Sequence, residues 1–224
     1  MIVLVAHGTR DPAGPKVTEE LAARVRSRGV EVKIAYADVR QPDVTTVLDS
    51  VRGPAVVVPA FLAAGYHVRV DIPAQVAASR NRDVVVAEAF GPAPELLDAL
   101  TERLRQAGRR PGDAVVLAAA GSSDQRALRD VATAAHALAG RLRTPVRVGY
   151  AATTSPSVAE VVAAARGEGR RVAVASWLLA PGLFQRRVTD AAADVTAEPL
   201  GAHPAIADLV LRRYREALRA ARAA

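Results

Sequence analysis

The chain has 224 residues, of which 50% are hydrophobic, and it carries a formal net charge of +7. It contains no cysteine, which excludes disulfides, iron–sulfur ligation and a thiol nucleophile, so a bound metal must use nitrogen and oxygen ligands. No stretch of about 18 apolar residues predicts a membrane span. The residues after Met1 lack the features of a signal peptide, so we expect a cytoplasmic protein with no membrane partner.

Short apolar runs rich in valine alternate along the chain with longer segments of helical periodicity. The runs cover residues 2–6, 30–36, 55–60 and 83–87, and then 114–119, 145–149, 171–176 and a weaker one near 195–199. They do not alternate apolar with polar residues, which predicts strands covered on both faces, as in a parallel sheet. A linker rich in Gly and Pro over residues 106–112 predicts two lobes, residues 1–108 and 113–224.

Each lobe is therefore expected to be an α/β unit, a four-stranded parallel sheet flanked by helices. Right-handed crossovers make 2-1-3-4 the expected strand order, in which the first strand lies between the second and the third. The loops that follow these three strands then meet at one edge of the sheet. Open α/β sheets bind their ligands at this edge, beyond the carboxyl ends of the strands.

The loop after the first strand carries His7, which the apolar run delivers directly into a turn at Gly8. The same strand, glycine turn, hydroxyl residue and aspartate recur at the start of the second half. There Ala120 and Gly121 stand in the places of His7 and Gly8. The second half thus repeats the scaffold of the first without the imidazole.

Two further places repeat in register, and each loses a side chain able to bind a metal. The aligned segments are Phe61–Arg69 with Leu178–Arg186, and Tyr36–Pro42 with Tyr150–Pro156. His67 becomes Phe184 in the first pair, and Asp38 becomes Ala152 in the second. The joint loss is most simply explained if the first-half residues form one site, which became redundant in the second half after an internal duplication.

The chemistry of such a site favours a metal that is held and then released. Two imidazoles with at most one carboxylate leave coordination positions open, whereas a closed cage of four ligands would store the ion. A neutral imidazole can also accept a proton near neutral pH. This donor set suits Fe²⁺, Co²⁺, Ni²⁺ and Zn²⁺ alike, so the site alone does not name the metal.

Three segments carry a resemblance to a known family. They are Ala6–Asp11 (AHGTRD), Pro59–Pro73 (PAFLAAGYHVRVDIP) and the degenerate Ser176–Gly182 (SWLLAPG). Together they resemble the sirohydrochlorin chelatases among the class II tetrapyrrole chelatases, over essentially the whole chain. The resemblance implies two flavodoxin-like lobes facing each other across a cleft, and insertion of Fe²⁺ into sirohydrochlorin for siroheme. The alternative is insertion of Co²⁺ or Ni²⁺ for a corrinoid-type pathway. The divalent metal is then a substrate, and no organic cofactor is expected.

The resemblance also implies roles for particular residues. His7 and His67 are expected to be the catalytic residues that bind the metal. Asp38 stands where many relatives have glutamate, and it is either a third metal ligand or a turn residue before Pro42.

The expected substrate carries carboxylates, for which the chain offers several binding candidates. The candidate substrate-binding residues are Gly8, Arg10, Arg69 and Arg186. Gly8 would let a flat ligand approach the backbone, and the arginines would bind carboxylates or else pair with Asp11 and Asp71. In the second half Arg186 and Arg187 keep positive charge after the imidazole is lost, so that half is expected to form the other wall of the cleft.

The basic composition leaves few other partners. Basic runs lack the interleaved aromatic residues of a single-strand nucleic-acid platform, so a polyanionic small molecule, the tetrapyrrole, is expected and no nucleic acid. A non-catalytic metal or tetrapyrrole carrier is the alternative function on the same scaffold. A nucleotide-binding module is disfavoured because no Gly-x-Gly-x-x-Gly motif is present. The expected assembly is a monomer or a weak homodimer.

Overall fold

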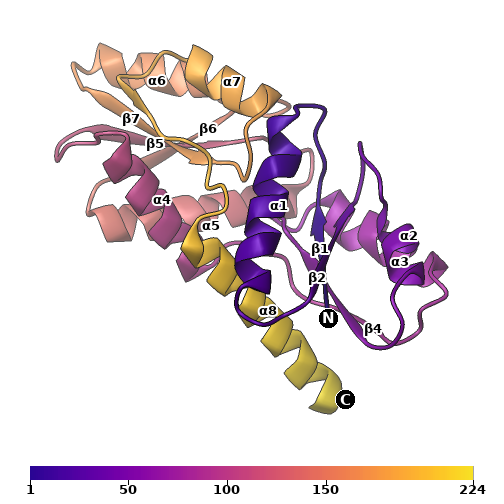
Figure 1. Ribbon diagram of the computed structural model, residues 1–224. Coiled ribbons are helices and arrows are strands. Elements are labelled where there is room, and N and C mark those ends of the chain that lie inside the picture. Colours follow the sequence, from indigo (N-terminus) through magenta and orange to yellow (C-terminus); the bar gives the residue numbers. More distant parts are fainter. Residues whose placement is uncertain (224) are drawn as a thin grey trace. The chain divides into compact units, whose positions relative to one another are not determined.

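The computed structural model describes residues 1–223 and consists of two compact units (Figure 1). The first unit joins Met1–Gly91 to the chain after Gly201, and the second is Pro92–Gly201. Ala224, the last residue of the predicted C-terminal lobe, lies outside the described residues. No helix within residues 1–223 is both long enough and apolar enough to cross a membrane.

The first unit is built on a parallel sheet with strand order β2-β1-β3-β4. Its elements in chain order are β1 (Ile2–Ala6), α1 (Ala13–Arg26), β2 (Val32–Tyr36), α2 (Val44–Asp49), β3 (Ala55–Pro59), the π-helix η1 (His67–Asp71), α3 (Ile72–Ala78), β4 (Val84–Val86) and α8 (Pro204–Ala223). The predicted order 2-1-3-4 is confirmed, and β1 is the central strand next to both β2 and β3.

Both faces of this sheet are covered, as the continuous apolar runs predict. Successive side chains of a strand point to opposite faces. Val3 and Val5 lie in a buried cluster with residues of α2 and α3, while Ile2 and Leu4 are equally buried on the other face. Helices therefore cover both faces of this sheet.

The second unit repeats this layout with strand order β6-β5-β7-β8. Its elements are α4 (Pro94–Gln106), β5 (Ala114–Ala119), α5 (Gln125–Leu142), β6 (Val146–Tyr150), α6 (Val158–Gly167), β7 (Val172–Trp177), α7 (Leu183–Asp190) and β8 (Val195–Thr196). The predicted fold class, two four-stranded all-parallel sheets flanked by helices, is confirmed.

The division by packing differs from the predicted lobes 1–108 and 113–224 by one helix in each. α4 follows β4 in sequence but packs on β7 and α5 of the second unit. α8 follows β8 but packs on α1, β3 and β4 of the first unit. Periodicity shows that a helix has an apolar face, and it does not show which of two equivalent sheets that face covers.

Polar contacts hold each exchanged helix in place. On α8, the Arg213 guanidinium donates to the Glu88 carboxylate at 2.9 Å and to the Phe90 carbonyl at 3.4 Å, and the Arg213 side chain is only 11% exposed. On α4, Arg103 donates to the Leu200 carbonyl at 3.3 Å. Each helix therefore contacts the segment just after the last strand of the sheet on which it packs.

Candidate metal centre

Three loops at the carboxyl edge of the first sheet carry the candidate ligands. His7 follows β1, Asp38 follows β2 at a distance of one residue, and His67 opens η1 beyond β3. The strands are in register, with Ala6 beside Tyr36 and Val5 beside Pro59. Neighbouring strands lie about 4.8 Å apart, so residues far apart in sequence meet here.

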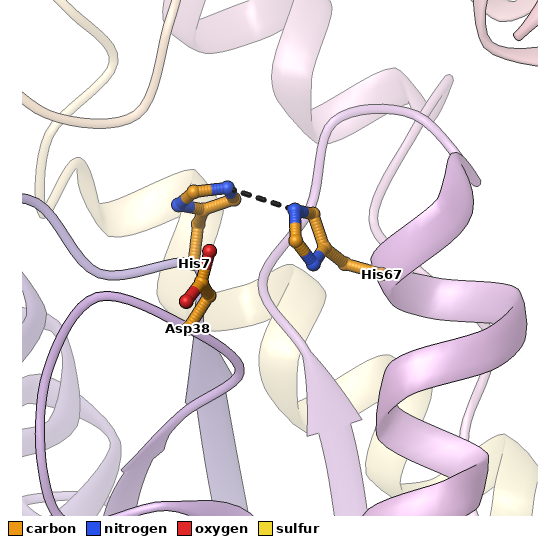
Figure 2. A group of neighbouring side chains, drawn as sticks. All are labelled: His7, Asp38 and His67. Carbon is orange, nitrogen blue, oxygen red and sulfur yellow. Dashed lines mark hydrogen bonds between the residues drawn. The ribbon is translucent and has the colours of Figure 1, made fainter.

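The structure brings the three predicted residues together. Among residues 1–223, His7, Asp38 and His67 form the one group of three potential metal ligands, with ligand atoms all within 4.8 Å of one another. The two Nε2 atoms are 3.0 Å apart, and the imidazole rings are nearly perpendicular at 87°. Figure 2 shows the His7 and His67 rings facing each other, with the Asp38 carboxylate beside His7.

The second nitrogen of each ring has an oxygen partner. Nδ1 of His7 donates to the Gly8 carbonyl at 2.9 Å, and Nδ1 of His67 donates to the Asp71 carboxylate at 2.6 Å. We assign the hydrogen of each neutral ring to Nδ1 on this basis. Both Nε2 lone pairs then face the same point, where they need either a shared hydrogen or a cation between them.

A cation fits the geometry of the two imidazoles. Bonds of about 2.1 Å from two nitrogen atoms that are 3.0 Å apart meet at about 90°. This is the angle between neighbouring ligands in the facial arrangement of two histidines and one carboxylate that binds Fe²⁺ with open positions. The Asp38 carboxylate, which lies within 4.8 Å of both imidazoles' ligand atoms, is the candidate third donor. The donor set therefore suits a divalent transition metal that stays accessible to a second ligand.

Backbone geometry fixes Asp38 beside His7. The Asp38 amide donates to the His7 carbonyl at 3.1 Å, and its carboxylate accepts from the Val39 amide at 2.6 Å. Gly8 has φ +92°, and a Cβ at this position would lie 2.3 Å from the Asp38 carbonyl oxygen. Only glycine allows this approach, so Gly8 is required for the backbone between the two ligands.

Aromatic side chains border the cluster. The Phe61 ring lies 6.1 Å from the His7 ring and 6.2 Å from the His67 ring, measured between centroids. Tyr66 contacts His67 edge to face, and its side chain is among the most exposed large side chains of the chain, at 61%. An exposed ring next to the ligands leaves apolar surface on which a flat molecule can lie.

The second unit keeps the scaffold and lacks the ligands. Gly121 has φ +95°, and a Cβ there would lie 1.9 Å from the Ala152 carbonyl oxygen. The Ala152 amide donates to the Ala120 carbonyl at 2.9 Å, as Asp38 does to His7. Thr153 has φ 66° where Val39 has φ 64°. The two turns thus have the same backbone, and the differences lie in the side chains.

The arginines predicted to bind substrate lie on these same loops. Arg10 is exposed after Gly8, Arg69 is exposed on η1, and Arg186 is exposed on α7. The guanidinium of Arg187, next to Arg186, donates to the Ala151 carbonyl in the loop after β6 at 3.2 Å. Their contact with a substrate stays a prediction.

Sequence reasoning missed the partner of His67. Asp71 was considered only as an ion-pair partner of arginine, and the structure places its carboxylate on Nδ1 of His67. The spacing of four residues was the available signal, since side chains four apart on a helix lie on one face.

The sheet and the cluster together define an internally duplicated α/β protein with a candidate metal centre of two histidines and one aspartate on its first half. The CbiX family model matches residues 1–107 and 114–217, and the chain belongs to this family. The predicted resemblance to the sirohydrochlorin chelatases is confirmed.

Relatives and solved structures agree with this assignment. The chain is 24% identical to a sirohydrochlorin ferrochelatase of Priestia megaterium, with 97% of this chain and 90% of the relative covered. It is 28% identical to a sirohydrochlorin cobaltochelatase of Methanopyrus kandleri, with 47% of this chain and 95% of the relative covered. The second relative matches about half of this chain over almost its own whole length, which agrees with a duplication.

The same fold occurs in SirB from Bacillus subtilis. The structure of SirB with Fe³⁺ superposes with a TM-score of 0.78 at 24% identity, covering 96% of this chain and 94% of that one. The SirB structure in complex with cobalt gives a TM-score of 0.75 at 25% identity, with the same coverage.

Proposed function

We propose that this chain inserts a divalent metal ion into sirohydrochlorin, with Fe²⁺ as the first candidate and Co²⁺ or Ni²⁺ as the alternatives. The observation that carries the proposal is the pair of imidazole Nε2 atoms 3.0 Å apart beside a carboxylate, on the exposed rim of a sheet in a chain of the CbiX family. The relatives include one sirohydrochlorin ferrochelatase, which matches over almost the whole chain, and three cobaltochelatases, which match over half of it or less, so both metals are supported.

The reaction requires two tasks of the same residues. A divalent ion enters the macrocycle while two pyrrole N–H groups lose their protons. His7 and His67 hold the ion through Nε2, with open positions toward the macrocycle. As the ion passes to the pyrrole nitrogens, the vacated Nε2 lone pairs accept the two protons, which balances the charge. Because both Nδ1 atoms already donate to oxygen, Nε2 is the acceptor on each ring.

An anaerobic absorbance assay with sirohydrochlorin and Fe²⁺, Co²⁺ or Ni²⁺ tests the proposal and ranks the metals by kcat/KM. Multiple turnovers with substoichiometric protein support an enzyme. Binding of one metal or one macrocycle per chain without turnover would instead support the carrier function. The divalent ion is a substrate of the enzyme or the cargo of the carrier, and the protein supplies the donor atoms in either case.

Asp38→Ala is expected to weaken metal binding less than the loss of either histidine. The carboxylate lies within 4.8 Å of the imidazole nitrogens but also accepts a backbone hydrogen bond from Val39, so part of its role is to hold the turn. We expect a loss of about 5- to 30-fold in kcat/KM, or about 1–2 kcal/mol, the size of one hydrogen bond. Asp38→Asn, which keeps the acceptor, separates the two roles. Equal losses for Asp38→Ala and His7→Ala would make Asp38 an essential ligand.

Arg186→Ala is expected to raise KM for the tetrapyrrole by about two- to fivefold with kcat unchanged, because an exposed charge contributes about 0.5–1 kcal/mol to binding a carboxylate. The effect should grow at low ionic strength, where exposed charges are less screened. Arg219→Ala, which removes another exposed arginine near the end of α8, is the charge-matched control. Arg187 is unsuitable because it holds a backbone carbonyl. A KM that is unchanged at low salt would leave Arg186 as surface charge.

A further inference from the structure

His67 and Asp71 belong to a short π-helical turn that the second unit does not repeat. The turn, η1, comprises His67–Asp71, and its last residue is the one that contacts its first: Oδ2 of Asp71 lies 2.6 Å from Nδ1 of His67. Both side chains are about 30% exposed, at 30% and 29%. Single π turns within helices occur frequently at functional sites.

The contact determines which nitrogen of His67 is available. A carboxylate only accepts hydrogen bonds, so Nδ1 of His67 must carry the hydrogen and Nε2 keeps its lone pair. The same contact fixes the ring rotation that places Nε2 3.0 Å from Nε2 of His7. In metal sites, such an outer carboxylate orients the histidine and raises its basicity.

The second unit shows that the fold does not require a carboxylate here. The alignment that pairs His67 with Phe184 and Arg69 with Arg186 also pairs Asp71 with Val188. Val188 is fully buried in the apolar cluster of its unit and lies on α7, a regular α-helix. The histidine, the carboxylate and the π turn are thus all absent together, whereas the glycine and the arginine of the same loop remain.

We propose that Asp71 is a positioning residue for metal insertion: its carboxylate holds His67 with the hydrogen on Nδ1, so that Nε2 faces the metal. The expected effect of Asp71 on catalysis rests on the proposed function. The contact between Asp71 and His67 is a property of the metal-free protein and does not depend on that function. Asp71 does not touch the metal or the macrocycle in this scheme, and acts through His67.

The direct test is the tautomer of His67 in the metal-free protein, read from imidazole ¹⁵N chemical shifts. The chain has only four histidines, so each ring can be assigned by single substitutions. The spectra are taken at about pH 8.5, two units above the ordinary pKa of imidazole. The full-length protein should show His67 with its hydrogen on Nδ1. In Asp71→Val, which installs the residue of the second unit, the hydrogen should shift largely to Nε2.

The second readout is Co²⁺ affinity, measured by calorimetry and by the visible absorption of the bound ion. Asp71→Val should weaken Co²⁺ binding by about 10- to 100-fold, the usual effect of losing an outer-shell partner. Asp71→Asn, whose amide oxygen can still accept from Nδ1, should lie between Asp71→Val and the natural protein. Asp83→Asn is the control for charge: Asp83 is exposed and precedes β4 at the opposite end of the sheet.

The outcomes separate the two proposals. Unchanged His136 and His203 signals show that a variant is folded. An unchanged His67 tautomer or an unchanged Co²⁺ affinity in folded Asp71→Val overturns the positioning role. If the tautomer and the affinity change as expected but the natural protein inserts no metal into sirohydrochlorin, the positioning role stands and the proposed function fails.

Discussion

Replacing His7 or His67 by alanine is expected to lower kcat/KM for metal insertion by about 10²- to 10⁴-fold, the usual contribution of a group that transfers protons in a reaction. Each histidine supplies one of the two converging Nε2 atoms, so neither can replace the other. Thermal unfolding should hardly change, because His7 is exposed and His67 is only partly buried. Anaerobic turnover and calorimetric Co²⁺ binding check the first expectation, and a thermal melt checks the second.

His136→Ala is the matched control for these variants. His136 is exposed on α5 of the second unit and belongs to no metal cluster among the described residues. It should retain full activity and full Co²⁺ binding. Natural turnover in His7→Ala or in His67→Ala would remove that residue from the mechanism.

Gly8→Ala should both destabilise the protein and weaken its metal site. An alanine at φ +92° is strained by about 1–3 kcal/mol, and its Cβ would lie 2.3 Å from the Asp38 carbonyl oxygen. The turn must open to relieve this clash, which moves Asp38 and His7 apart. We expect a lower midpoint of denaturation and at least a tenfold loss in Co²⁺ affinity, measured by denaturant titration and calorimetry.

Two other glycines separate these effects. Gly53→Ala has nearly the same φ, +91°, but nothing lies within 4 Å of the added Cβ, so it reports the backbone strain alone. Gly121→Ala meets the Ala152 carbonyl oxygen at 1.9 Å in the second unit, so it reports strain and clash away from the ligands. It should destabilise at least as much as Gly8→Ala and leave Co²⁺ affinity unchanged. A loss of Co²⁺ affinity in Gly121→Ala would contradict the assignment of the metal to the first unit.

The sheets and the cluster of candidate ligands could be predicted because the sequence patterns that indicate them are either local, as in a strand, or repeated in the second half of the chain. Valine-rich runs determined the strands, and crossover handedness determined their order. The internal repeat showed that His7, Asp38 and His67 are all replaced in the second half, which indicates a single site. The predicted strand order then placed all three at one edge of the sheet. The geometry of the cluster agrees with that reasoning, and the roles of its members as ligands stay predictions.

The helix exchange and the Asp71 contact could not be predicted for different physical reasons. α4 and α8 each present an apolar face that fits either of two equivalent sheets, so the choice depends on tertiary packing. The contact between His67 and Asp71 depends on a π turn, which has no sequence signature comparable to a cap or a proline. On a helix, spacing favours His67, four residues before Asp71, over Arg69, two residues before it. The structure shows that the Asp71 carboxylate contacts the histidine.

The exchanged helices determine when each half can be completed during synthesis. The second unit is one continuous segment, Pro92–Gly201, whereas the first needs α8, which is translated after the whole of the second unit. Nascent domains fold as units once their residues are available. The half that carries the candidate metal centre begins to be translated first, yet its β3 and β4 gain the cover of α8 only after the whole second unit has been made. The first half to be started is thus the second to be completed.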